Sequence, residues 1–224
     1  MTSIGTGYDL SVSTYSPDGR VFQVEYAEKA VDNSGTAIGL RVKGGVVLAV
    51  EKIKHSPGRH IGVASAGWMS DTRHLVKRTR DEASHYHGTY KANIPAKIIA
   101  ERMGMYIQAY TLYSSVRPFG VSTILATVDV DGPQLYMIEP SGQYMGYRGC
   151  AAGKGKQAAK TEIEKLDLDN LSVRDALKEA ARIIYASNGL HTHVPQDVFD
   201  EAVEYAEKAN DDDDDDEEME DDDL

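Results

Sequence analysis

Strand-like and helix-like segments follow one another in separate blocks along this 224-residue chain. A hairpin with glycines in its loop and a third strand precede a pair of helices. A second group of strands, joined by Gly- and Pro-containing turns, precedes further helices. These blocks favour an α+β fold, with two sheets face to face and helices outside, over alternating βαβ units. The expected strands are residues 36–42, 46–51, 61–66, 122–130, 134–139 and 143–149, and the expected helices are residues 70–87, 95–113, 155–166, 172–187 and 196–209.

The first pair of helices carries start signals. We expect Ser70 or Asp71 to be the N-cap of the first helix, because a side-chain oxygen at that position accepts a bond from a free backbone N–H. Pro95 stands at the start of the second helix, where its missing N–H costs nothing.

An extended segment precedes the first strand. Tyr8-Asp9-Leu10 leads to the turn Ser16-Pro17-Asp18-Gly19, in which Pro17 presets φ and Gly19 tolerates the positive φ that often ends a turn. We therefore expect a folded head that is retained in the protein. A helix follows, with apolar or aromatic residues at Val21, Phe22, Val24, Tyr26, Ala27 and Val31.

The net charge comes from the C-terminal end. The chain has 36 acidic and 24 basic residues, and 12 of the acidic ones lie between Asp211 and Leu224, so the remainder is neutral. No basic face for nucleic acid follows from these totals, and the acidic end would repel phosphate. We expect residues 210–224 to be a disordered tail, because they contain too few apolar residues to fold.

Further sequence features bear on the compartment and on metals. Met1 to Leu10 has no basic start and no apolar stretch, and no window approaches a membrane span, so we expect a soluble intracellular protein. Cys150 is the single cysteine and cannot form an internal disulfide. The pairs His85/His87 and His191/His193 have no third ligand at a suitable spacing, so we expect no metal site and no cofactor.

Several motifs, in order along nearly all of residues 1–210, resemble those of proteasome core-particle α subunits, above all the α type-3 group. The similarity to that group rests on Leu10 and on the acidic C-terminal end. The motifs are Tyr8-Asp9, Ser16-Pro17-Asp18-Gly19-Arg20, Gln23-Val24-Glu25-Tyr26-Ala27, Gly35-Thr36-Ala37-Ile38-Gly39, Tyr110-Thr111-Leu112-Tyr113, Arg117-Pro118-Phe119-Gly120-Val121-Ser122, residues 135–142 and residues 153–162.

The resemblance implies a four-layer αββα sandwich in a seven-membered α ring of the 20S core particle. It implies a non-catalytic structural and gating subunit in ubiquitin-dependent and ubiquitin-independent protein degradation, located in cytoplasm and nucleus. The implied partners are other proteasome α and β subunits and regulatory activator particles, with no nucleic acid and no membrane. The N-terminal gate cluster, carried over by position, is Tyr8, Asp9, Pro17 and Tyr26.

The chain departs from the family pattern at three places. Leu10 replaces the usual arginine, which removes a charged partner for Asp9. The segments 53–60 and 186–193 are shorter than in the family, so the expected sandwich lacks up to two strands. The lysine of the activator pocket has no matching position; Lys54 is the nearest lysine but lies outside the motif.

Two other functions are compatible with the residues. One is a threonine-type hydrolase matured by cleavage near Ser34 or Thr36, because such enzymes use an N-terminal threonine whose free amine is the base. Retention of the head argues against it. The other is an acidic-tailed binding protein outside any ring. The expected division of the chain is a gate tail and helix at 1–33, an α-type domain at 34–209 and the tail at 210–224.

Overall fold

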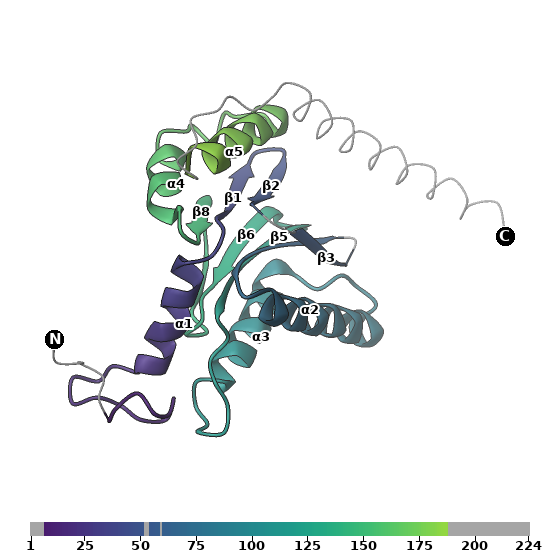
Figure 1. The fold of residues 1–224 in the computed structure, drawn as a ribbon. Helices are drawn as coiled ribbons and strands as arrows, with labels where there is room; N and C mark the ends of the chain where they lie inside the picture. The colour runs from purple at the N-terminus through teal and green to yellow at the C-terminus, as the bar shows by residue number, and fades with distance from the viewer. Residues whose placement is uncertain (1–6, 52–53, 59, 188–224) are drawn as a thin grey trace. The chain divides into compact units, whose positions relative to one another are not determined.

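The computed structural model describes residues 7–51, 54–58 and 60–187 (Figure 1). The expected helix at 196–209 and the acidic tail lie outside this part of the chain. The helices are α1 (Phe22–Asp32), α2 (Met69–Tyr90), α3 (Ala96–Ala109), α4 (Lys156–Ile163) and α5 (Val173–Ser187), and the strands are β1 (Ala37–Val42), β2 (Gly45–Val50), β3 (Lys54–Gly58), β4 (Ile61–Gly67), β5 (Val121–Asp129), β6 (Gly132–Ile138), β7 (Tyr144–Gly146) and β8 (Gly149–Ala152).

The strands form two antiparallel sheets. One has the order β2-β1-β8 and the other the order β3-β4-β5-β6-β7. The predicted first hairpin is confirmed: Val42 faces Gly45 across a two-residue turn, and Ala37 faces Val50 at the far end. The hairpin of β5 and β6 runs in unbroken register from Thr123 opposite Ile138 to Asp129 opposite Gly132.

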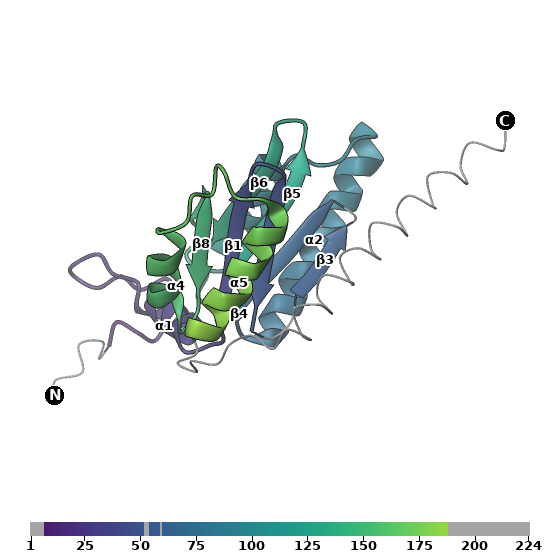
Figure 2. The ribbon, with the colours of Figure 1, turned by 90° about the horizontal axis from the view of Figure 1, so that it is seen from above.

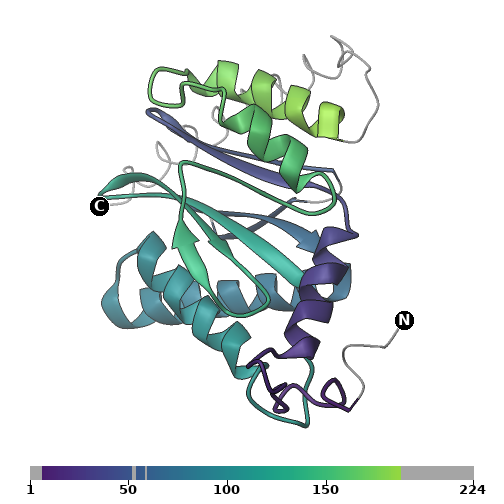
Figure 3. The same ribbon diagram turned by 90° about the vertical axis from the view of Figure 1, so that its left-hand side faces the viewer.

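The sheets and helices make four layers, as the predicted αββα sandwich requires (Figure 3). Helices α2 and α3 cover the outer face of the five-stranded sheet (Figure 1), while α4 lies over β8 and α5 over β1 and β2 of the three-stranded sheet (Figure 2). Three apolar cores separate the layers. Representative members are Leu75, Ile99 and Leu125 under α2 and α3; Leu40, Ala159 and Ile183 under α4 and α5; and Ala64, Ile124 and Cys150 between the sheets.

The shortened segment after β2 still contains a strand. Residues Lys54–Gly58 form β3 and pair with β4, with a register shift between His55 and Gly58. The expectation that this sheet lacks a strand is therefore wrong, because five residues suffice for an edge strand that needs a partner on one side only. The three-stranded sheet is short of strands in the described part of the chain, and residues 188–193 of the second shortened segment lie outside that part.

The predicted strand 143–149 is divided between the two sheets. Tyr144–Gly146 pairs with β6, whereas Gly149–Ala152 crosses to β1, where Gly149 faces Leu40 and Ala152 faces Ala37. A side chain at Gly149 would lie 2.4 Å from Cγ2 of Ile163 in α4, so the crossing strand needs glycine there.

The predicted N-cap of α2 is also wrong. The cap position is Trp68, which makes no side-chain cap bond, and α2 already includes Ser70 and Asp71. The Asp71 carboxylate turns inward to Arg117 and to the backbone N–H of Gly120. Helix α3 ends at Ala109, before the predicted residue 113, because residues 110–112 form turns.

Candidate functional site

The head begins with the predicted turn. The N–H of Gly19 donates to the carbonyl of Ser16 at 2.9 Å, and Gly19 has a φ of 80°. The N–H of Arg20 donates to the Ser16 hydroxyl oxygen at 2.9 Å, and that of Ser16 to the carbonyl of Arg20 at 3.0 Å. Ser16 is buried, so the loop is closed by its own hydrogen bonds before α1 starts.

Asp9 is tied to α1, seventeen residues further along the chain. The Tyr26 hydroxyl donates to Oδ2 of Asp9 at 3.1 Å. The side-chain amide of Gln23, one turn earlier on α1, donates to the Asp9 carbonyl. Partial burial and the hydrogen bond to Asp9 raise the pKa of Tyr26, so the hydroxyl remains a donor at neutral pH. Two contacts therefore hold the lead-in against the helix.

An ion pair fixes the start of α1. Arg20 donates through Nε to Glu25 at 2.6 Å and through Nη2 to the other carboxylate oxygen, which makes a bidentate pair. This pairing lowers the pKa of Glu25 and raises that of Arg20. The Arg20 guanidinium also lies 4.9 Å from the centre of the Phe22 ring.

Of the four predicted gate residues, the structure brings two together. Asp9 and Tyr26 are hydrogen-bonded, while the side chains of Tyr8, Pro17 and Tyr26 are all exposed. In the described part of the chain, no hydrogen bond links the Tyr8 hydroxyl to Asp9 or Tyr26. Leu10 is 87% exposed and gives Asp9 no charged partner.

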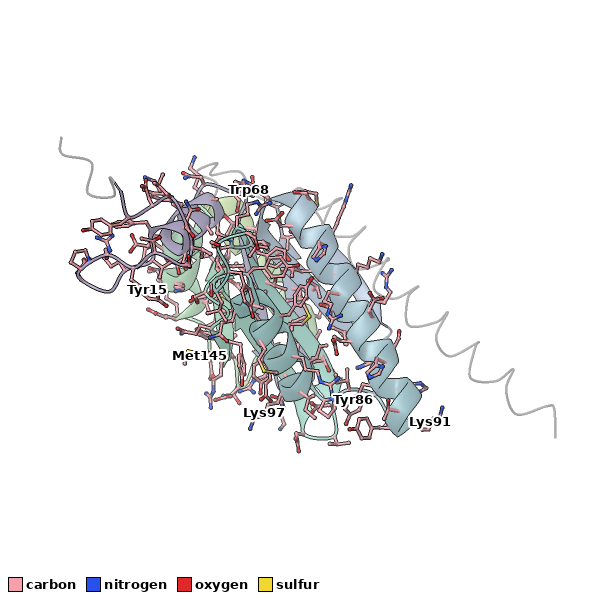
Figure 4. The ribbon with its side chains drawn as sticks, turned by 90° about the horizontal axis from the view of Figure 1, so that it is seen from below. Tyr15, Trp68, Tyr86, Lys91, Lys97 and Met145 are labelled. Atoms are coloured by element: carbon pink, nitrogen blue, oxygen red, sulfur yellow. The ribbon has the colours of Figure 1, made fainter. Side chains whose placement is uncertain are left out.

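The sequence did not predict three further residues that hold the head in place, Gln23, Arg20 and Glu25. All three lie in the quoted motifs, but their spacing does not predict which of them reaches Asp9. Tyr15 lies in the same head and is 62% exposed (Figure 4).

Thr36, the candidate nucleophile of the alternative hydrolase, is buried and follows Gly35 in the chain. Thr36 is 1% exposed, and its hydroxyl oxygen accepts the N–H of Gly155 at 3.1 Å. The nitrogen of Thr36 is a peptide N–H that donates to the Glu51 carboxylate at 2.9 Å. The Ser34 hydroxyl donates to the carbonyl of Val31 at 2.7 Å. In this chain neither hydroxyl has a free amine beside it.

The remaining sequence candidates are two histidine pairs and the activator-pocket lysine. His85 and His87 lie in α2, and His191 and His193 lie outside the described residues. Among the described residues, no three His, Cys, Asp or Glu side chains are grouped to hold a metal ion. The activator-pocket lysine stays unassigned, since the position of the Lys54 side chain is not described. No helix in the described part is long and apolar enough to cross a membrane.

Comparison with known proteins decides the family. Residues 31–190 match the proteasome subunit family, and residues 8–30 match the N-terminal signature of proteasome A subunits. The chain belongs to the proteasome subunit family. The signature spans the lead-in, the turn and most of α1, so the contacts between Asp9, Gln23 and Tyr26 all fall within it.

Named relatives agree with the predicted α type-3 resemblance. Proteasome subunit alpha type-3 of Acanthamoeba castellanii is 52% identical over 240 residues, covering 92% of this chain and 95% of the relative. The protein of that name from Spinacia oleracea is 54% identical over 198 residues, covering 83% of this chain and 80% of the relative. Probable proteasome subunit alpha type-7 of Schizosaccharomyces pombe is 47% identical over 244 residues, covering 94% and 96%.

These alignments also bear on the shortened segments. Alignments of 240 and 244 positions are longer than the whole 224-residue chain. Gaps must therefore fall inside the aligned part of this chain, so the relatives contain internal residues that it lacks.

Proposed function

We propose that this chain is a non-catalytic subunit of the α ring of the 20S proteasome core particle, where its N-terminal head helps to gate the admission of substrates. The proposal starts from membership of the family and the match to the A-subunit signature. The observation that carries the gating role is the bond between Tyr26 and Asp9, because it fixes the direction in which the chain leaves α1 towards its N-terminus.

The buried Thr36 supports a non-catalytic role. A threonine nucleophile of this class needs a free α-amine as its base. The nitrogen of Thr36 is committed to the peptide bond with Gly35 and to Glu51, and its hydroxyl is committed to Gly155. Catalysis would require removal of the folded head and loss of these contacts.

The partners follow from assembly into the particle. They are other proteasome α and β subunits and regulatory activator particles, in the cytoplasm and nucleus, in ubiquitin-dependent and ubiquitin-independent degradation. Nucleic acid and membranes are not proposed as partners. The neutral balance of residues 1–210 and the 12 acidic residues after them give no surplus of positive charge for a phosphate backbone.

The gate is tested with Tyr26→Phe and Asp9→Asn in assembled core particles. In this proposal the bond holds the head in the arrangement that opens the axial pore of the α ring. Each variant removes or weakens this bond, which contributes about 1 kcal/mol, so the ratio of open to closed arrangements falls by about fivefold. Activator-stimulated hydrolysis of a fluorogenic peptide should fall in both variants, and the double variant should fall no further. Tyr15→Phe is the matched control, since it deletes an exposed hydroxyl of the same head.

Two results would overturn the proposal. Unchanged peptide hydrolysis in Tyr26→Phe particles that assemble normally on native gels would remove the gating role. An intact mass showing that the assembled subunit starts at Ser34 or Thr36 would support the threonine-type hydrolase instead.

A further inference from the structure

Among the described residues, the two sheets have four edge strands, and three of them carry features that discourage pairing with another chain. Strand β7 has three residues and β8 has four. Strand β3 contains Pro57 and an irregular register. Short strands, proline and bulges are the usual protection of a sheet edge. Strand β2 has none of these, since its six residues read GVVLAV without charge or proline, in unbroken register with β1.

The backbone direction of β2 follows from the hairpin. Val42 and Gly45 flank a two-residue turn and form a hydrogen-bonded pair, so the alternate residues Val46, Leu48 and Val50 point their N–H and C=O groups away from β1. The hydrogen bonds of β1 are consistent with this direction. Arg41, which lies opposite Val46, donates its N–H to the carbonyl of Arg148 at 2.7 Å, on the side of β1 away from β2. No described strand pairs with β2 on its outer side.

The side chains of β2 are also incompletely covered by the described residues. Val46, Leu48 and Val50 face the core between the sheets but are only partly buried, whereas Ile38 and Leu40 of β1 are fully buried. A strand that is apolar on both faces is typical of a sheet interior. A further strand beside β2 would cover these side chains and satisfy the outward backbone groups.

We propose that β2 is a self-association edge, on which the β2 strand of a second copy of this chain pairs antiparallel. A two-fold axis at Leu48 places Leu48 opposite its own copy and Val46 opposite Val50 of the second copy. All three residues have outward backbone groups, so each facing pair exchanges two hydrogen bonds. The pairing joins two three-stranded sheets into one continuous sheet and leaves no outward group of β2 unpaired.

A second copy fits this edge better than a charged partner does. The edge has no charged residue, so another uncharged apolar strand is its natural complement. Each chain has a net charge of −12, which opposes association of two copies. Salt screens that repulsion, so the dimer should strengthen as salt rises, opposite to the response of an interface held by ion pairs. This inference does not depend on the proposed role in the particle.

The test is sedimentation velocity of the purified full-length chain over a range of concentrations, at about 50 and about 500 mM NaCl. We expect a monomer–dimer equilibrium that shifts toward dimer at the higher salt. Val46→Pro removes one outward N–H without breaking a bond to β1 and should weaken dimerisation by about tenfold or more. Far-UV circular dichroism checks that this variant is folded.

A second pair of variants keeps the test valid if Val46→Pro does not fold. Val46→Lys should weaken dimerisation by placing a charge in the partly buried strip that the second copy would cover, and Val128→Lys, at an exposed strand end, should not. Far-UV circular dichroism checks that both lysine variants are folded. A monomer at every concentration, or self-association that Val46→Lys leaves unchanged, would overturn the proposal. So would slow hydrogen exchange at Leu48 in the monomer, because that edge would then already be covered within one chain.

Discussion

At the scale of single residues, Asp71 combines burial with several polar contacts. It is 6% exposed and accepts bonds from Arg117 at 2.7 and 2.9 Å and from the N–H of Gly120 at 3.0 Å. Arg117 in turn lies 4.9 Å from the centre of the Trp68 ring, at the start of α2 (Figure 4). Burial alone would raise the pKa of Asp71, but these bonds outweigh it and the pKa is lowered.

Replacing Asp71 by Ala should lower the free energy of unfolding by about 1–3 kcal/mol at pH 7, because it leaves the buried N–H of Gly120 without its acceptor and breaks the pair with Arg117. Since the pKa of Asp71 is lower in the folded protein, its contribution is complete above the unfolded value of about 4 and is lost as the pH falls through the folded value. Urea unfolding at pH 7 and at about pH 3 measures both effects. A difference between wild type and variant that does not shrink at low pH would contradict this account.

At the scale of elements, α3 depends on a neighbouring hairpin for its start. Its cap residue is Pro95, which has no side-chain oxygen. The N–H of Ala96 donates instead to Oδ2 of Asp129, at 3.1 Å, and Oδ1 of the same side chain accepts the N–H of Asp131. One carboxylate therefore fixes both the helix start and the turn between β5 and β6.

Asp129→Ala should cost about 1 kcal/mol, the usual loss for a helix cap, through the first turn of α3. Asp131→Ala is the matched control, because Asp131 contributes its backbone N–H and keeps it in the variant. Thermal unfolding followed by circular dichroism measures both variants. Equal losses in the two would show that a general charge effect, and not the cap, is responsible.

At the scale of the whole described fold, small residues set how closely the two sheets approach. Ala37, Ala64, Ala66 and Ala152 line the core between them. A side chain at Gly39 of β1 would lie 2.7 Å from Leu135 and 3.0 Å from Ile124, both in the opposite sheet. Glycine at position 39 is therefore required by the spacing of the sheets and not by its own backbone angles.

Gly39→Ala should destabilise the protein by about 1–3 kcal/mol, because an added methyl group overpacks a core that is closed on both sides. Gly88→Ala makes the same change in α2, where nothing lies within 4 Å of the added carbon, and should stabilise the helix by up to about 1 kcal/mol. Chemical denaturation of both variants gives the comparison. A neutral Gly39→Ala would mean that the sheets can separate without cost.

Local patterns were sufficient for much of this fold. The head turn, α1, the first hairpin and the strands around β4, β5 and β6 lie within a few residues of their predicted positions, because glycine, proline and apolar spacing act over short distances. The interpretation failed where a distant partner decided the outcome. Asp71 is of a residue type that commonly caps a helix, yet its carboxylate binds Arg117 and Gly120, some fifty residues away, instead.

By itself, then, the sequence determined the layered α+β class, the folded segment in front of Thr36 and the family resemblance that the comparisons confirmed. Only the tertiary structure decided that Asp9 meets Tyr26 and Gln23, that residues 144–152 divide between two sheets and that no described strand pairs with the outer side of β2. The physical reason is that propensity and turn chemistry depend on near neighbours. Strand partners, buried carboxylate contacts and the close approach of sheets depend on residues that only folding brings together.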